Sequence, residues 1–156
     1  MGTTFTTKNW TMTTTNELYE NPWVYDGAAV LDPPDDFYGF VYIITNLKSN
    51  KKYIGKKFFY SKVSKPPLKG KTRRRRSVKE SDWKTYYGSN KELNEDVQRE
   101  GKEHFKREIV KLCASKGECS YWEAKLQFDN NVLTEEHWYN EWIMVKTHRK
   151  HVKGLK

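Results

Sequence analysis

Cysteine and long apolar runs are scarce in this chain, and each scarcity excludes a class of protein. The only two cysteines, Cys113 and Cys119, are too few for a disulfide framework, and their spacing to the four histidines matches no zinc pattern. No apolar stretch approaches the roughly 20 residues that cross a bilayer. The Thr-rich N-terminus also lacks the apolar segment of a signal peptide. We therefore expect a soluble, cytoplasmic protein with no membrane partner.

Apolar residues are few in general, at 36% of the sequence, and the mean hydropathy is −0.97. Aromatic residues nevertheless make up 15% of the chain, and each of them can bury roughly 150–250 Å². A length of 156 residues corresponds to about one domain. We therefore expect a single domain whose small core is rich in aromatic side chains.

Acidic residues are scarce in one part of the chain, and the net charge of +9 arises there. Residues 1–39 contain one Lys against six Asp or Glu, whereas residues 48–84 contain fifteen Lys or Arg against two. Residues 85–156 are nearly balanced, at thirteen against twelve. Such a concentration of positive charge is typical of a surface that binds nucleic-acid phosphates. A membrane surface is a poorer partner, because Lys69–Lys79 has no apolar face.

A β-hairpin precedes this basic region. Two β-type runs, Phe40–Thr45 and Lys51–Ile54, flank the turn-rich stretch Asn46–Asn50. Each strand carries a tyrosine, Tyr42 in the first and Tyr53 in the second. Because side chains alternate along a strand, the even-numbered residues of the first run share one face and the odd-numbered residues share the other.

The segment after the hairpin, Ser61–Arg76, is predicted to be a long basic loop or a frayed helix, because it contains a proline pair among its Lys and Arg residues. A helix is predicted over Ser89–Glu100. In this helix Ser89 and Glu92 form a capping box, and Gly101 ends the helix.

The second half of the chain adds one strand and one helix. Phe105–Cys113 is rich in β-forming residues and is predicted as a strand. A second helix begins at Ser120, and Glu123 lies at the position that closes its capping box. The aromatic segment Glu135–Val145 is open to two interpretations, a last helix or a packed extended segment. The order predicts an α+β fold with a small antiparallel sheet of about three strands flanked by helices.

Three regions are expected along the chain. Residues 1–36 combine a flexible tail, up to about residue 15, with an ordered aromatic arm. Residues 37–145 form the domain itself, with a basic insertion at about 61–80, and residues 146–156 form a basic C-terminal tail. The acidic aromatic arm leaves open a third class of function, contact with a protein partner.

The motifs Phe40-Val41-Tyr42 and Tyr53-Ile54-Gly55 resemble the paired signature of the GIY-YIG endonuclease family, with Phe-Val-Tyr in place of Gly-Ile-Tyr. The resemblance continues, in the family's order, to Glu123 in Tyr-Trp-Glu-Ala and to Asn140 in Trp-Tyr-Asn. Lys71–Ser89 is similar to phage-encoded members. The family resemblance implies a three-stranded antiparallel sheet and metal-dependent cleavage of DNA in a host-cell cytoplasm. It leaves open whether the protein forms a homodimer.

The resemblance also implies roles for individual residues. Glu123 would bind a single Mg²⁺ or Mn²⁺ ion, which keeps most of its waters. Tyr42 would help to activate the attacking water, and Tyr53 would orient that network. Asn140 would hold the site together by hydrogen bonds.

An arginine is expected to stabilise the charge that develops on the phosphate. Our first choices are Arg73 and Arg74, followed by Arg75 and Arg76. Lys56 or Lys84 would substitute in part, without the bidentate geometry of arginine. The residues expected to contact nucleic acid are Lys56, Lys57, Lys71, Arg75, Arg76, Lys84 and Tyr87.

Two competing interpretations concern the same surface. Pro34-Asp35 and Glu123-Ala124-Lys125 spell the sparse elements of another endonuclease superfamily, in which Asp35 would be essential. A non-catalytic module would instead bind phosphates with Arg73–Arg76 and stack aromatic residues of the segment 83–87 on bases. The joint presence of two motif tyrosines, a helical glutamate and the late asparagine favours the GIY-YIG interpretation.

Overall fold

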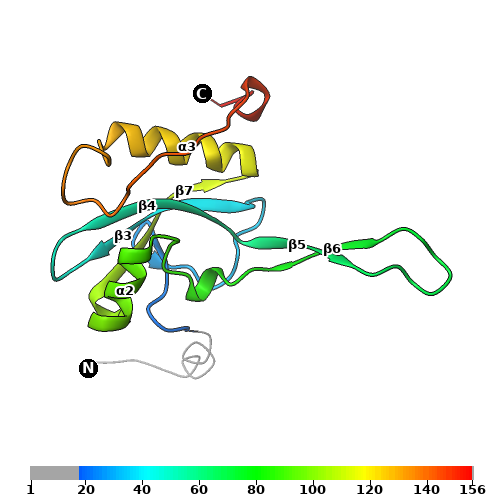
Figure 1. Ribbon diagram of the computed structural model, residues 1–156, viewed down its shortest axis with the longest axis horizontal. Coiled ribbons are helices and arrows are strands. Elements are labelled where there is room, and N and C mark those ends of the chain that lie inside the picture. Colours follow the sequence, from blue (N-terminus) through cyan, green and yellow to red (C-terminus); the bar gives the residue numbers. More distant parts are fainter. Residues whose placement is uncertain (1–17, 156) are drawn as a thin grey trace, which may run out of the picture.

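The protein is described by a computed structural model over residues 18–155, so the predicted flexible tail lies outside the described residues. The described chain forms a central sheet, a separate two-stranded ribbon and two α-helices (Figure 1). The helices are α2 at Lys91–Glu100 and α3 at Lys116–Asp129, with short 3₁₀ turns η1 at Trp83–Thr85, η2 at Lys102–His104 and η3 at Arg149–His151. The predicted α+β class is confirmed.

The central sheet has the strand order β2-β1-β7-β3-β4. Its strands are β1 (Val24–Tyr25), β2 (Ala28–Ala29), β3 (Gly39–Asn46), β4 (Lys52–Phe58) and β7 (Phe105–Cys113). β3 pairs antiparallel with β4 and with β7, whereas β1 pairs parallel with β7. The prediction of about three strands is therefore wrong in size. The aromatic arm supplies two short strands that cover the outer edge of β7, which would otherwise expose unpaired backbone groups.

The two faces of the sheet pack against different helices (Figure 1). Tyr42 and its even-numbered neighbours in β3 lie in a core with Leu93 of α2. Val41 lies on the opposite face in a core with Cys119 of α3. The predicted hairpin and its alternation are confirmed. β4 is the outermost strand beyond β3, and residues 137–140 and Gln127 cover its outer edge at Lys52 and Ile54.

Both helices begin at positions that differ from the predictions. Asn90 caps α2, because its side chain accepts a hydrogen bond from the Leu93 amide at 2.9 Å. Ser115 caps α3 in the same way, which moves the start of that helix upstream of Ser120. The two predicted capping boxes are therefore wrong, and Glu123 lies in the middle of α3 with its carboxylate free of any capping role.

The basic insertion is a β-ribbon. β5 (Tyr60–Lys65) pairs antiparallel with β6 (Arg75–Glu80) in a sheet of their own, which extends away from the body in Figure 1. The prediction of a loop or frayed helix is wrong for residues 61–65 and 75–76, which lie in the strands, and correct for residues 66–74, which form the loop between them. Pairing is tolerated because most cations face neutral residues across the ribbon, as in Lys62 opposite Val78. Only at the outer end does Lys65 lie opposite Arg75.

The aromatic segment near the C-terminus is extended rather than helical. Trp138 forms a parallel bridge with Lys52 of β4, and the Tyr139 amide donates to the Lys52 carbonyl at 2.7 Å. The chain then returns to α3, where His151 packs against Gly117. Within residues 18–155, neither helix is long and apolar enough to span a bilayer.

A buried arginine holds the arm to the sheet. Arg107 in β7 donates through Nη1 to the Tyr86 carbonyl at 2.8 Å and through Nε to the Asn21 carbonyl at 3.1 Å. Its guanidinium lies 4.7 Å from the Trp23 ring and 4.2 Å from the Tyr87 ring. Burial lowers the pKa of Arg107, yet arginine retains its charge at any working pH. Arg107 therefore ties the arm to the loop that precedes α2.

Candidate active site

A cavity of about 250 Å³ opens at the edge of β4. The polar residues that line it include Tyr42, Tyr53, Lys56, Ser61, Ser89 and Glu123. They come from β3, β4, the root of the ribbon, the loop before α2, and α3. The cavity thus brings together the two motif tyrosines and the predicted metal-binding glutamate, although they are far apart in sequence.

The glycine of the second motif makes room for both tyrosines. Gly55 lies directly opposite Tyr42 in the β3–β4 pairing. A Cβ atom on Gly55 would lie 2.7 Å from the Tyr42 ring and 2.9 Å from the Tyr53 ring, closer than packed atoms approach. The two ring centroids are 6.2 Å apart. The Tyr-Ile-Gly motif therefore has a steric basis in this chain.

The two phenols differ in exposure and in electrostatic surroundings. Tyr42 is fully buried, and burial, the neighbouring Tyr86 and Tyr53 phenols and the Glu123 carboxylate raise its pKa well above the ordinary value. Burial also raises the pKa of Tyr53, but a hydrogen bond with Ser89, 3.1 Å between the oxygens, opposes that shift. Both phenols are consequently protonated at neutral pH.

Glu123 reaches the cavity from α3 and meets a lysine of β4. The Lys56 ammonium donates to Glu123 Oε1 at 2.9 Å, and the glutamate side chain is only 12% exposed. One turn later, Gln127 donates to the Ile54 carbonyl at 3.0 Å. The helix is therefore fixed to β4 at the level of the cavity, and the carboxylate is held above the strand that carries Tyr53.

Lys57, the next residue, points to the opposite face of the sheet, as alternation requires. Its ammonium lies 2.6 Å from Asp82 Oδ1 and 4.0 Å from the centre of the Tyr86 ring. The hydrogen bond from Lys57 lowers the pKa of Asp82. The two lysines of β4 that border the cavity are thus each paired with a carboxylate.

Asn140 does not line the cavity but braces the strand beside it. Its side chain accepts from the Ile54 amide at 3.1 Å and donates to the Ile54 carbonyl at 2.9 Å. Ile54 stands between Tyr53 and Gly55, so these two bonds set the position of the motif backbone. The asparagine therefore acts on the site through β4, as a positioning residue.

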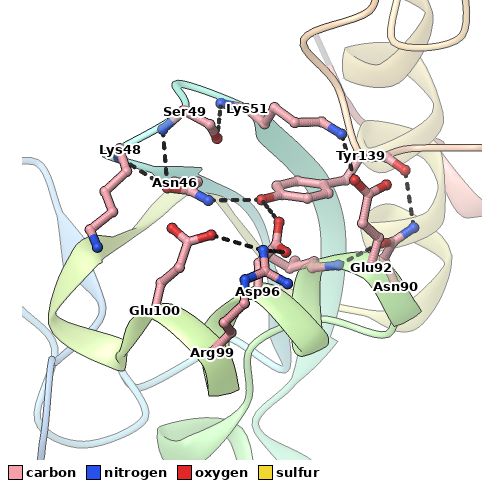
Figure 2. Close-up of polar contacts among 11 residues, drawn as sticks. Asn46, Lys48, Ser49, Lys51, Asn90, Glu92, Asp96, Arg99, Glu100 and Tyr139 are labelled. Carbon is pink, nitrogen blue, oxygen red and sulfur yellow. Dashed lines mark hydrogen bonds and ion pairs between the residues drawn. The ribbon is translucent and has the colours of Figure 1, made fainter.

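The neighbour of Asn140 anchors the same segment to α2 (Figure 2). The Tyr139 hydroxyl donates to Asp96 Oδ2 at 2.7 Å and accepts from the Asn46 amide at 3.0 Å. Its carbonyl accepts from the side chain of Asn90 at 3.0 Å. Burial raises the pKa of Tyr139 to about 12, and the bond to Asp96 adds to the shift. This buried network holds the Asn140 segment between the hairpin turn and α2.

The four consecutive arginines lie elsewhere. Arg73–Arg76 are exposed at the outer end of the ribbon, with Arg75 and Arg76 at the start of β6 and the other two in the loop before it. Arg74 donates to Ser64 Oγ at 2.9 Å, and Arg75 donates to the Pro66 carbonyl at 3.2 Å. Strand pairing carries this stretch out into solvent, so the structure does not bring Arg73 or Arg74 to the cavity. Lys71 lies in the loop that joins the two ribbon strands.

Of the residues expected to touch nucleic acid, one is buried and another lies outside the cavity. Tyr87 is 5% exposed, lies under Arg107, and accepts a hydrogen bond from Asn21 at 3.0 Å. A contact between Tyr87 and nucleic acid does not fit this burial. Lys84 lies outside the cavity, with its ammonium 3.9 Å from Asp32 Oδ1.

The donor set of the cavity fits a hard divalent cation held by one side chain. Among residues 18–155, no three His, Cys, Asp or Glu side chains gather where they could hold a metal ion. Glu123 is the carboxylate that lines the cavity, and Asp35 does not line it. Magnesium is often held by one or two carboxylates and keeps several waters. An ion on Glu123 would take over the carboxylate oxygen that Lys56 contacts here.

Two residues at or beside the cavity were not predicted as part of the site. Ser89 was expected to cap α2, but it bonds to Tyr53 instead, and Asn90 takes the cap. Both residue types suit a cap, so only packing separates them. Trp142 lines an adjoining hollow of about 190 Å³ together with Glu123, and no local pattern marks that position.

The architecture and the cavity define a nuclease domain in which two tyrosines on a hairpin meet a glutamate on a later helix. The chain belongs to the GIY-YIG endonuclease family, of phage type: residues 23–143 match the family model described as "Putative endonuclease segE, GIY-YIG domain". The predicted resemblance is confirmed. This class of protein implies DNA as the substrate. Neither a curated protein nor a solved structure matches the chain.

Proposed function

We propose that this chain is a divalent-metal-dependent DNA endonuclease whose reaction takes place in the cavity at the edge of β4. The observation that carries the proposal is the position of Glu123. Its carboxylate lies in a polar cavity, 2.9 Å from the Lys56 ammonium and beside the phenols of Tyr42 and Tyr53. Binding of phosphate in general does not require a carboxylate there, since a carboxylate repels phosphate.

Glu123 would hold the ion, either Mg²⁺ or Mn²⁺, through oxygen. When bound, the ion supplies polarisation of a phosphoryl oxygen and of a bound water. Family membership supports this role for Glu123, and the partial burial of its carboxylate increases the interaction with any cation.

Lys56, rather than an arginine, would stabilise the charge that develops on the phosphate. Its ammonium neutralises Glu123 in the free protein. With a cation held by the carboxylate, the Lys56 ammonium would be available to contact a nonbridging oxygen of the scissile phosphate. Lysine offers a point charge rather than a bidentate fork, so it stabilises developing charge without fixing the orientation of the phosphate.

The tyrosines orient the attacking water. Tyr53 is the more exposed phenol, and its hydroxyl is already held by Ser89 at 3.1 Å. Tyr42 donates a hydrogen bond in its protonated form. Burial is the largest cause of the raised pKa of Tyr42 and persists when a cation binds at Glu123, so Tyr42 would orient the water through its protonated hydroxyl.

Cleavage of supercoiled plasmid in Mg²⁺ tests the proposal. We expect the wild type to nick or cut the plasmid, EDTA to abolish the activity, and Glu123→Gln to reduce it at least about 100-fold. Glu118→Gln, in the first turn of the same helix, is the matched control and should retain activity. Equal cutting by Glu123→Gln would contradict the proposal. Binding without any cutting by the wild type would support the non-catalytic alternative instead.

A further inference from the structure

The β5–β6 ribbon is the most strongly charged feature of the molecule. Residues 61–79 contain nine Lys or Arg and no Asp or Glu. Every residue of β6 is exposed. The carboxylate at the root, Glu80, accepts a hydrogen bond from the Trp83 indole at 2.8 Å and faces the body of the protein.

Both faces of the ribbon carry this charge. Residues that lie opposite each other in the pairing share a face, and every second residue returns to it. One face therefore carries Lys62 and Arg76, and the other carries Lys65, Arg75 and Lys79. A ribbon that lay flat on a row of phosphates would need only one basic face. Charge on both faces suits insertion between two rows of phosphates.

The root of the ribbon is fixed beside the cavity. Tyr60 and Ser61, at the start of β5, line the cavity with Glu123. Phe59, just before β5, is fully buried, and the Ser81 amide, just after β6, donates to the Phe59 carbonyl at 2.8 Å. Both ends of the ribbon are therefore held by the body, and its direction relative to the cavity is set.

We propose that the ribbon enters the major groove of duplex DNA on one side of the bond that the cavity cleaves. The major groove, roughly 12 Å wide, admits a two-stranded ribbon, whereas the minor groove is only about 6 Å wide. A single strand is a poorer occupant, because its binding relies on aromatic stacking, and beyond Tyr60 at its root the ribbon, residues 61–80, contains no aromatic residue. This inference rests on the proposed function only for the position of the cleaved bond.

The ribbon also sets a distance along the duplex. Lys65 lies five residues beyond Tyr60, and a strand rises by about 3.3 Å per residue, so the outer paired residues lie roughly 17 Å from the cavity wall. That length corresponds to about five base pairs. A duplex trimmed to fewer than about five base pairs on the ribbon side of the cut should therefore lose the contribution of the ribbon.

Fluorescence anisotropy with a labelled duplex and the matching single strand tests binding by the ribbon. Replacing all four of Arg73–Arg76 with Ala should weaken duplex binding about 100-fold near physiological salt. The plot of log association constant against log salt concentration should become less steep by about three units of slope. A control with the same change in charge replaces the exposed Lys91, Lys102, Lys106 and Lys125 with Ala and should lose less than about 3-fold. Equal losses in the two variants, or equal affinity of the wild type for both strand forms, would overturn the proposal.

Competition between ligands identifies the groove. Methyl green, which occupies the major groove, should displace the wild type from the duplex, and netropsin, which occupies the minor groove, should not. The reverse order would overturn the assignment. All substituted side chains are exposed, so each variant should keep the circular dichroism spectrum of the wild type.

Cleavage assays distinguish failure of this inference from failure of the proposed function. If the wild type cuts plasmid and the four-arginine variant binds and cuts equally well, the ribbon proposal fails and the nuclease proposal stands. If duplex binding depends on the ribbon but the wild type never cuts, the nuclease proposal fails and the ribbon proposal stands.

Discussion

The cavity and the ribbon are both basic, but their cations have different surroundings. At the cavity, Lys56 and Lys57 are paired with Glu123 and Asp82. Along the ribbon, none of the nine Lys or Arg residues is paired with a carboxylate in the part of the chain that the structure describes. An exposed cation without a carboxylate partner attracts phosphate at long range. A lysine paired with a carboxylate becomes available to phosphate only when another cation binds that carboxylate. The comparison therefore assigns DNA binding to the ribbon and bond cleavage to the cavity, within one small domain.

The largest expected effect concerns which cation serves the reaction. Lys56→Gln should lower the single-turnover cleavage rate about 100-fold, because it removes the ammonium that faces the phosphate. Arg74→Gln, on the ribbon, should leave that rate within about 3-fold of wild type at saturating DNA.

Lys56→Arg provides the control for this pair, since it keeps the charge and should recover much of the rate. Thermal unfolding shows whether the variants are folded. A loss of rate in Arg74→Gln together with normal cleavage by Lys56→Gln would reverse the assignment and place the catalytic cation on the ribbon.

The next effect concerns stability. Asn140→Ala removes two buried hydrogen bonds to Ile54 and leaves the Ile54 amide without a partner, while the Ile54 carbonyl keeps the hydrogen bond from Gln127. The free energy of unfolding should therefore fall by about 2 kcal/mol. Arg76→Ala should change it by less than about 0.5 kcal/mol, because that side chain is exposed. Urea denaturation measures both values. If the two variants lost equal stability, the ribbon would be part of the packed structure, contrary to the comparison.

The smallest effect is a pH dependence confined to the body. The folded pKa of Tyr139 is raised to about 12 from an ordinary value of 10.0, so its contribution to stability is complete below pH 10 and is lost as the pH rises toward 12. Between pH 10 and pH 12, the free energy of unfolding of the wild type should fall by about 1–2 kcal/mol more than that of Tyr139→Phe. Urea denaturation at several pH values measures this difference. The four-arginine variant is the reference, and its free energy of unfolding should change with pH as that of the wild type does.

Local patterns predicted the parts of the fold that depend on neighbouring residues. The hairpin with Tyr42 and Tyr53, the strand Phe105–Cys113 and the end of α2 at Gly101 all follow from alternation, β propensity and glycine, and the structure agrees. The cap of α2 was misplaced by one residue, because Ser89 and Asn90 are equally suitable until Tyr53 takes up the serine hydroxyl.

Features that depend on distant pairing could not be predicted in this way. The strand at Val24–Tyr25 exists because β7 offers an open edge, and the ribbon exists because its two halves pair across a long loop. For the same reason the sequence did not reveal that Arg74 lies on the ribbon while Lys56 faces Glu123. The motifs marked Glu123 and Asn140, but only the fold shows that one lines the cavity and the other braces β4.

The separation of chemistry from binding is tested most directly by measuring duplex affinity and single-turnover cleavage rate in two variants of the full chain. Glu123→Gln should bind the duplex within about 3-fold of wild type and cut at least about 100-fold more slowly. The four-arginine variant should bind about 100-fold more weakly and, at saturating DNA, cut at nearly the wild-type rate. Parallel loss of affinity and rate in both variants would contradict the account.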